Sequence, residues 1–197
     1  MTRTITPPVA QAARWTLAQY EQLVDTGLLE GRRVELIAGI ITEMSPASNP
    51  HDACVSITAD WARERLGRSC YVREEKGVDL PDNESVPEPD IVVCARRRDF
   101  YAHAKPQPED VVLLAEVAAS SLNYDRRVKA PLYAAAGIPE YWTVNLVDRQ
   151  LEVYLPGDEV GAYAEPQIYR EGDRFEHALL GSVAVADLLP MRSEADA

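Results

Sequence analysis

The sequence predicts a single-domain α/β protein, and three observations support this fold class. The chain has 197 residues, without an internal repeat or a dividing linker, which fits one domain with a sizeable core. Residues 111–115 are a run of five apolar residues rich in β-branched side chains, as in a buried strand. Shortly afterwards, Asp125, Lys129 and Tyr133 recur at every fourth position, which places them on one face of a helix.

The composition is ordinary for a globular protein, with 46% hydrophobic and 26% charged residues. The sequence contains no run of about 18 apolar residues, so we expect no membrane span. Cys54, Cys70 and Cys94 are an odd set without the spacing of a zinc site or of a disulfide framework. We therefore expect reduced thiols in or near the core.

The expected organisation has three parts. Residues 1–14 form an irregular N-terminal segment, residues 15–190 form the folded domain, and residues 191–197 form a disordered tail. The N-terminal segment lacks the apolar core of a signal peptide, which predicts a cytoplasmic location.

The first expected elements are a helix and a hairpin. Thr16 followed by Gln19 is a capping-box pattern, and an apolar stripe then predicts a helix to about residue 26. Residues 32–44 contain two β-rich runs on either side of Ala38-Gly39, which predicts a hairpin.

A loop and a longer helix are expected next. Residues 45–50 form the loop, because Pro46 and Pro50 break regular structure there. Apolar spacing then predicts a helix from His51 to about Leu66. In its first turn, His51 is either a surface or capping residue or part of a functional site.

The second half of the chain alternates strands with loops and one helix. Ser120, Ser121 and Asn123 offer capping oxygens before this helix, which must kink or restart at Pro131. The further elements expected are a strand pair at 71–80, a loop at 81–89, a strand from 91, a loop with some helix at 96–110, strands at 140–144 and 150–155, a hairpin at 163–175 and a closing strand or turn at 183–189.

The net charge of −12 argues against a broad phosphate-binding surface, because affinity for nucleic acid comes mainly from lysine and arginine. The net charge does not exclude a local basic groove. The densest basic cluster is Arg96, Arg97 and Arg98, just after the strand that follows Asp90. This cluster is either a solvated loop or a phosphate contact.

Acids stand in or beside apolar strand sequence at three places. Glu35 lies inside VELI, where it either faces solvent or turns into a polar site. Asp90 precedes the apolar run at 91–93, and Glu116 directly follows the run at 111–115. Two carboxylates on neighbouring strands, with Lys129 on the following helix, predict a site for a divalent metal ion.

This set of residues also has a purely structural interpretation. Asp90 then caps a turn after Pro89, Glu116 marks a strand end, and Lys129 pairs with Asp125 across one helical turn. The functional interpretation is phosphodiester hydrolysis, in which Mg²⁺ or Mn²⁺ holds the attacking water and offsets negative charge. The lysine then orients or deprotonates water and stabilises the transition state.

An ordered series of motifs decides between these interpretations. The series, from about residue 33 to 190, is Glu35 in VELIAGIITEM, His51 ending MSPASNPH, Asp90 ending PEPD, Glu116 in LLAEV, then Asp125, Lys129 and Tyr133, and GIPEYW at 137–142. In this order and spacing the chain resembles the Uma2 family of restriction-endonuclease-like proteins, within the PD-(D/E)xK nuclease superfamily.

The resemblance implies a restriction-endonuclease-like domain with a central mixed β-sheet, flanked by helices, and a site at the sheet edge. Asp90 and Glu116 would be metal ligands. The superfamily's lysine normally follows the acid by two positions, where this chain has Ala118, so Lys129 would replace it. Glu35 would be a further metal-site or water-site acid, and His51 an auxiliary group of the same pocket.

The leading functional hypothesis is an endonuclease that uses Mg²⁺ or Mn²⁺ to cut DNA, as a homodimer whose two sites address two strands. The sequence does not distinguish DNA from RNA or a small phosphodiester as the substrate. The alternative, from another class, is a catalytically silent interaction module on the nuclease fold, which the acidity favours. Asn145 stands where the resemblance leads us to expect an acid, while every acid of the site is present.

Overall fold

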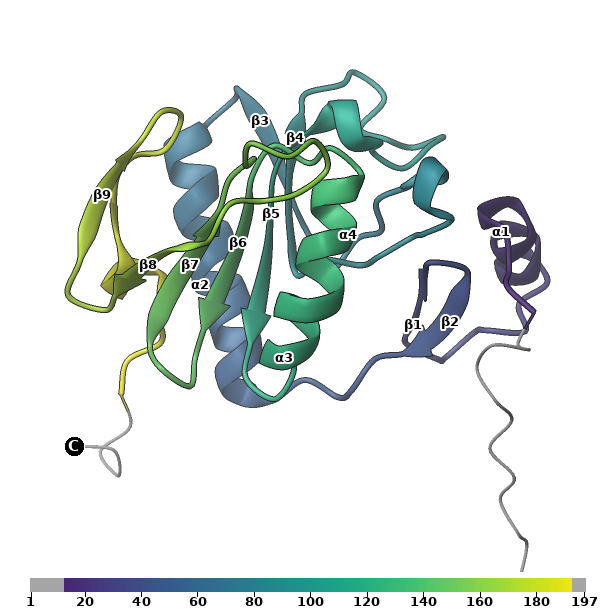
Figure 1. The fold of residues 1–197 in the computed structure, drawn as a ribbon, viewed down its shortest axis with the longest axis horizontal. Helices are drawn as coiled ribbons and strands as arrows, with labels where there is room; N and C mark the ends of the chain where they lie inside the picture. The colour runs from purple at the N-terminus through teal and green to yellow at the C-terminus, as the bar shows by residue number, and fades with distance from the viewer. Residues whose placement is uncertain (1–12, 193–197) are drawn as a thin grey trace, which may run out of the picture.

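The computed structural model describes residues 13–192, so most of the expected N-terminal segment and tail lies outside the described residues. Its centre is a six-stranded sheet in the order β3-β4-β5-β6-β7-β8 (Figure 1). The strands are β3 (Cys70–Glu74), β4 (Ile91–Ala95), β5 (Val111–Ala118), β6 (Tyr141–Asn145), β7 (Gln150–Tyr154) and β8 (Gln167–Arg170). Only β5 and β6 are parallel neighbours in this sheet, which confirms the predicted mixed sheet.

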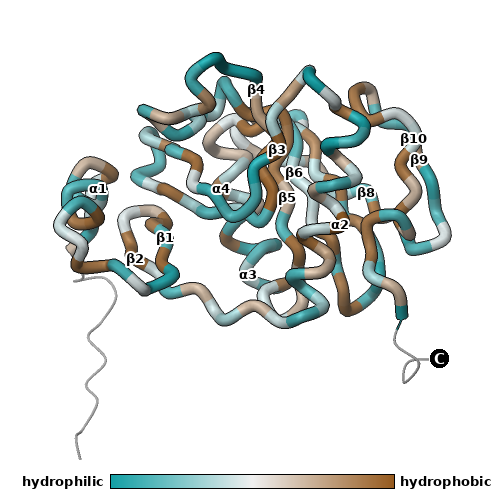
Figure 2. Tube along the Cα trace, turned by 180° about the vertical axis from the view of Figure 1, so that it is seen from behind, coloured by the Kyte–Doolittle hydropathy of each residue, from teal (hydrophilic) through white to brown (hydrophobic). Residues whose placement is uncertain are grey.

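Helices cover both faces of the sheet (Figures 1 and 2). One face carries α2 (Asn49–Leu66). The other carries α3 (Leu122–Tyr124), a π-helical turn (Asp125–Lys129) and α4 (Ala130–Ala135). None of the helices in the described part of the chain has the length and apolarity needed to cross a bilayer.

The period of β5 decides which side chains meet which helix. Leu113, Ala115 and Val117 belong to the core beneath α2, while Leu114 belongs to the core beneath α4. Successive side chains of a strand point to opposite faces, so Glu116 faces the α4 side. The apolar run that predicted this strand stops at Ala115, and the parallel pairing with β6 continues the strand to Ala118.

The helix that follows β5 changes its geometry beside Pro131, where the α-helix α4 starts again at Ala130 after a π-helical turn, in agreement with the predicted restart. Proline has no N–H to donate, and a π-helical turn precedes it, in which the N–H of Ala130 donates to the carbonyl of Asp125. This turn keeps Asp125 and Lys129 on the buried side of the helix. Of the residues expected to cap this helix, Ser121 directly precedes α3, and its side chain makes no capping hydrogen bond.

The N-terminal elements agree with the expectations. α1 (Leu17–Asp25) has the predicted capping box between Thr16 and Gln19. The hairpin consists of β1 (Val34–Ile37) and β2 (Ile40–Glu43), which pair antiparallel around Ala38-Gly39. Both turn residues have positive φ, 48° and 77°, as a two-residue hairpin turn requires. A Cβ on the glycine would also lie 2.9 Å from the carbonyl oxygen of Trp15.

Three predicted elements were wrong in extent or pairing. α2 begins at Asn49, within the expected loop, because a proline is tolerated in the first turn of a helix. Residues 71–80 provide one strand, β3, and not a pair, since Val78 and Leu80 bond to the loops around them instead. The expected hairpin at 163–175 is divided between two sheets.

The two strands of the expected hairpin are divided because each one pairs with a different neighbour. β8 completes the large sheet against β7, while β9 (Arg174–His177) pairs with β10 (Gly181–Ala184) as a separate ribbon. Tyr169 and Phe175 stack across the corner with ring centroids 4.2 Å apart.

The three cysteines are free, and two of them, Cys54 and Cys94, are buried, as expected of core thiols.

Asn145, where an acid was expected, is a structural residue. Its side-chain oxygen accepts the N–H groups of Val147 and Asp148 in the β6–β7 turn, and its amide donates to the buried Glu152. Glu152 is 1% exposed and also pairs with Arg126. Burial alone would raise the pKa of Glu152, but hydrogen bonds from Arg126, Asn145, Gln150 and Tyr154 lower it.

We predict that Glu152→Ala lowers the free energy of unfolding by about 2 kcal/mol, because buried donors lose their acceptor. The stabilisation from Glu152 should be complete above the unfolded carboxyl pKa, about 4.3, and fade as the pH falls through the lower native pKa. Urea unfolding near neutral pH and in acid measures both effects. The exposed acid Glu165 is the control, and its alanine variant should change stability by less than about 0.5 kcal/mol. Equal stability of the two variants would contradict the assignment.

Candidate active site

A cleft of about 410 Å³ opens at the end of the sheet where β4 begins and β5 ends. It contains every site residue predicted from the sequence. Five elements or segments supply them: β1, α2, the loop before β4, β5 and the helix after β5. The lining includes Glu35, His51, Asp90, Glu116, Asp125 and Lys129.

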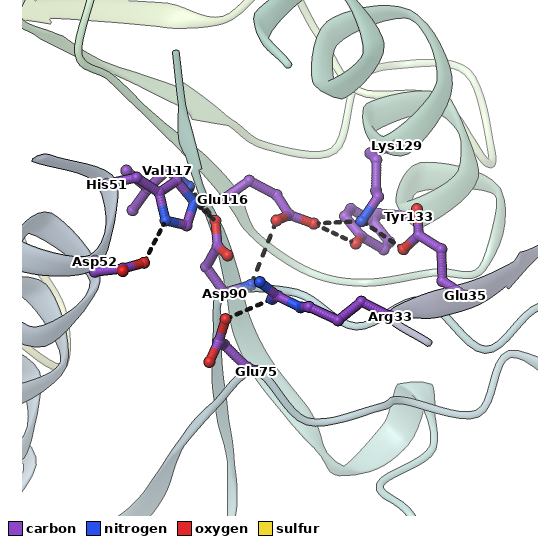
Figure 3. A network of polar contacts seen from close by, with 10 residues as sticks. All are labelled: Arg33, Glu35, His51, Asp52, Glu75, Asp90, Glu116, Val117, Lys129 and Tyr133. Carbon is purple, nitrogen blue, oxygen red and sulfur yellow. Dashed lines mark hydrogen bonds and ion pairs between the residues drawn. The ribbon is translucent and has the colours of Figure 1, made fainter. Parts of the chain in front are cut away.

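A buried lysine shared by two glutamates forms the inner wall of the cleft (Figure 3). The Nζ atom of Lys129 lies 2.8 Å from Oε2 of Glu35 and 3.0 Å from Oε1 of Glu116. The three residues are 4%, 2% and 5% exposed. Glu35 therefore does not face solvent, and Lys129 contacts the carboxylate two positions before Ala118, where the superfamily lysine would start.

Asp90 and Glu116 adjoin because of the strand register. Ile91 pairs with Ala115, so the residue before β4 lies beside the residue after Ala115. The backbone N–H of Asp90 donates to Oε2 of Glu116 over 3.3 Å. Its Oδ2 atom accepts the N–H of Val117 at 2.7 Å, which ties the Asp90 carboxylate directly to β5.

His51 approaches this pair of acids from the first turn of α2. Its Nε2 lies 3.2 Å from Oδ2 of Asp90 and its Nδ1 lies 3.4 Å from Oδ1 of Asp52 (Figure 3). The hydrogen bond to Asp90 raises the pKa of His51 to about 9, against the opposing effect of burial. The protonated imidazole is therefore an ion-pair partner of Asp90 in the metal-free protein.

Burial also affects the pKa values of two further acids of the cleft and of its lysine. It raises the pKa of Glu116 to about 8, and the neighbouring carboxylates add to this effect while Lys129 opposes it. It likewise raises the pKa of Asp125 to about 6. Burial alone would lower the pKa of Lys129, but Glu116 and Glu35 outweigh it and raise that pKa, so the amine is charged.

The charges in the cleft fit a divalent cation. The lining holds five acids and three basic side chains, so the cleft has an excess of two negative charges when all of them are ionised: Glu35, Glu43, Asp90, Glu116 and Asp125 against Arg33, His51 and Lys129. In addition, Oδ2 of Asp125 is buried without a hydrogen-bond partner. The donors are hard carboxylate oxygens, which suit Mg²⁺ or Mn²⁺.

Among the cleft acids, Asp90 and Glu116 are the pair that adjoin directly. Within residues 13–192, no three acidic, histidine or cysteine side chains converge as a ready metal-binding group. Lys129 lies between Glu35 and Glu116, which separates Glu35 from the other two acids. Asp90 and Glu116 are thus the adjoining carboxylates, and an ion held by two carboxylates keeps several waters.

Two supporting contacts were not assigned from the sequence. The hydroxyl of Tyr133 donates to Oε1 of Glu116 over 2.8 Å, a contact that the four-residue spacing from Lys129 could have indicated. Arg33, at the cleft entrance, pairs with Glu75 at 2.6 Å. No local pattern links these two residues, because they are distant in sequence.

The arginine cluster at 96–98 lies away from the cleft. Asp90 immediately precedes β4, whereas the cluster follows the other end of that strand. Arg97 pairs with Asp99 at 2.7 Å, and Arg96 stacks over the ring of Tyr71. The only basic side chains among the described cleft residues, apart from the histidine, are Arg33 and Lys129.

We predict that, in metal-free protein, the imidazole of His51 titrates near pH 9 and that Asp90→Asn moves its pKa toward 6.5. Because the native pKa exceeds the unfolded one, the stabilisation from this pair is complete below about pH 6.5 and is lost as the pH rises through 9. NMR titration measures the pKa, and Asp52→Asn is the control with a smaller expected shift. An unchanged His51 pKa in Asp90→Asn would refute the ion pair.

Comparison with solved structures places the fold. A crystal structure of a "putative nuclease belonging to DUF820" from Anabaena variabilis ATCC 29413 superposes with a TM-score of 0.69 at 15% sequence identity. The match covers 88% of this chain and 96% of that one. The predicted single-domain α/β fold with a mixed central sheet is therefore that of a solved protein.

Sequence comparison identifies the family. No curated protein matches this chain. The Uma2 family, described as "Putative restriction endonuclease", matches residues 17–189, which include all the acids of the cleft and Lys129. The chain belongs to the Uma2 family of restriction-endonuclease-like proteins.

Proposed function

We propose that this protein is an endonuclease that depends on Mg²⁺ or Mn²⁺ and hydrolyses phosphodiester bonds of DNA. The strongest support is the convergence of Asp90, Glu116, Glu35 and Lys129 in one cleft with an uncompensated negative charge. Membership in a restriction-endonuclease-like family supports nucleic acid as the substrate class. Free thiols are compatible with the expected cytoplasmic location, and the homodimer stays a prediction.

In this proposal Asp90 and Glu116 hold the metal ion. The bound ion supplies a Lewis acid that offsets the phosphate's negative charge and lowers the pKa of a coordinated water. Tyr133 donates to Glu116 and Val117 donates to Asp90, so both carboxylates are held in place before substrate arrives.

Lys129 acts as a charged group in this scheme. A raised pKa keeps its ammonium protonated, so it stabilises the charge that develops on the phosphate and orients water, and does not take a proton. Glu35 holds the ammonium from the other side and is a water-site acid. His51 is auxiliary, because its imidazole pairs with Asp90 and offsets the charge of that carboxylate.

A second candidate is an interaction module without activity. The net charge of −12 favours it, because a strongly acidic surface repels polyanions. The ion pairs of Lys129 with both glutamates would then serve stability alone. The two candidates differ in whether metal produces strand cleavage.

We predict that the purified protein nicks supercoiled plasmid DNA with Mn²⁺ and not with EDTA. Asp90→Asn and Glu116→Gln should each lower the rate by roughly a hundredfold or more, because each removes a charge that holds the metal ion. The exposed acid Glu165 provides the control, Glu165→Gln, which should retain the wild-type rate. Single- and double-stranded RNA are tested in parallel. Cleavage that survives both acid variants would place the chemistry elsewhere, and no cleavage by folded wild type would favour the interaction module.

We predict that Lys129→Met destabilises the metal-free protein by about 3 kcal/mol, because two buried carboxylates lose their counter-charge. A lysine with a purely catalytic role would instead leave the stability of the metal-free protein nearly unchanged when replaced. The double variant Lys129→Met/Glu35→Gln restores the charge balance and should recover much of that stability. It should nonetheless cleave about a hundredfold more slowly than the single variant Glu35→Gln. Equal rates of these two variants, measured at matched stability, would remove Lys129 from the mechanism.

A further inference from the structure

A second pocket, of about 420 Å³, has three arginines in its lining. Arg149, Arg170 and Arg192 line it together with two acids, Asp148 and Glu171. Its lining is therefore net positive, although the whole chain carries a charge of −12. None of these residues belongs to the catalytic cleft.

Two of the three arginines are held in defined positions by Glu171. Arg149 donates to both oxygens of Glu171, over 2.9 and 2.6 Å, and to the carbonyl of Pro190. Arg192 pairs with the same glutamate at 2.6 Å. The guanidinium of Arg170 has no ion-pair or hydrogen-bond partner among residues 13–192, so it is available to a ligand.

The strand register places this pocket at the same end of the sheet as the cleft. Ala118, between two residues of the cleft wall, pairs with Asn145, which pairs with Gln150, which pairs with Arg170. Three strand spacings of about 4.8 Å separate the first and last of these residues by roughly 14 Å.

A chain of contacts joins the two sites along this edge. Asp125 lines the cleft, and its neighbour Arg126 pairs with Glu152 while remaining 37% exposed. Glu152 also accepts a hydrogen bond from Gln150, which lines the arginine pocket. A cationic side chain thus lies between the acidic cleft and the arginines.

We propose that the arginine pocket binds a backbone phosphate of the nucleic-acid substrate, a few nucleotides away from the bond that is cut. This inference rests on the proposed nuclease function. An acidic cleft attracts a metal ion but repels a polyanion, so the phosphate backbone must be held beside it. Each nucleotide of a duplex strand adds about 3.4 Å along the helix axis, so a separation of roughly 14 Å spans at most about four nucleotides.

The test uses single arginine replacements in the full chain. Arg170→Ala and Arg192→Ala are compared with Arg68→Ala, an exposed arginine near the opposite end of the sheet, with the same change of charge. Binding of a labelled duplex oligonucleotide in EDTA is followed by fluorescence anisotropy over a range of salt concentrations. Thermal melts verify that each variant is folded, and plasmid nicking with Mn²⁺ is measured separately.

Each pocket variant should weaken binding about five- to tenfold near 0.1 M salt and reduce the slope of log K against log salt by about 0.9, as for one lost phosphate contact. Arg68→Ala should match the wild type in both quantities. If the wild type nicks plasmid DNA but both pocket variants keep its salt slope, the phosphate pocket is overturned and the proposed nuclease function is not. Losses in Arg68→Ala as large as those in Arg170→Ala would also overturn it. A wild type that neither binds nor nicks would overturn the pocket and the proposed function together.

Discussion

The shared ammonium of Lys129 is the interaction on which the arrangement of this protein depends. It joins the N-terminal hairpin, through Glu35, to the central strand, through Glu116. Removing three charged groups from water costs several kcal/mol per ion, and only close, well-formed pairs offset that cost. The hairpin position, the strand end and the helix are therefore coupled at one point, which is also the wall of the cleft.

The acids that line the cleft could be singled out from the sequence because their context was unusual. A charged residue inside a four-residue apolar strand, as at Glu35, must be either exposed or paired, and motif order favoured a site. Local periodicity likewise predicted the hairpin at Ala38-Gly39 and the helix face shared by Lys129 and Tyr133. These features depend on neighbours within a few positions, which a sequence displays directly.

Features that depend on distant partners could not be predicted in the same way. β8 and β9 look like one hairpin, but the free edge of β7 takes β8 and leaves β9 to pair elsewhere. The apolar run of β5 stops at Ala115, but the strand continues to Ala118 because its last residues pair with β6, and the sequence does not show this alignment. The same limit applies to Arg33, which meets Glu75 only in the folded chain.

The π-helical turn before Pro131 has a consequence for the geometry of this site. A π turn is equivalent to one residue inserted in an α-helix, and one residue corresponds to about 100° of rotation about the helix axis. The phase of the helix at Lys129 therefore depends on this turn, which lies directly before a proline that has no N–H to donate. A helix of regular α geometry over the same residues would turn the lysine by about this angle, away from Glu35 and Glu116. The backbone geometry of a single helical turn, and not only the identity of the side chains, thus determines whether the lysine lines the cleft.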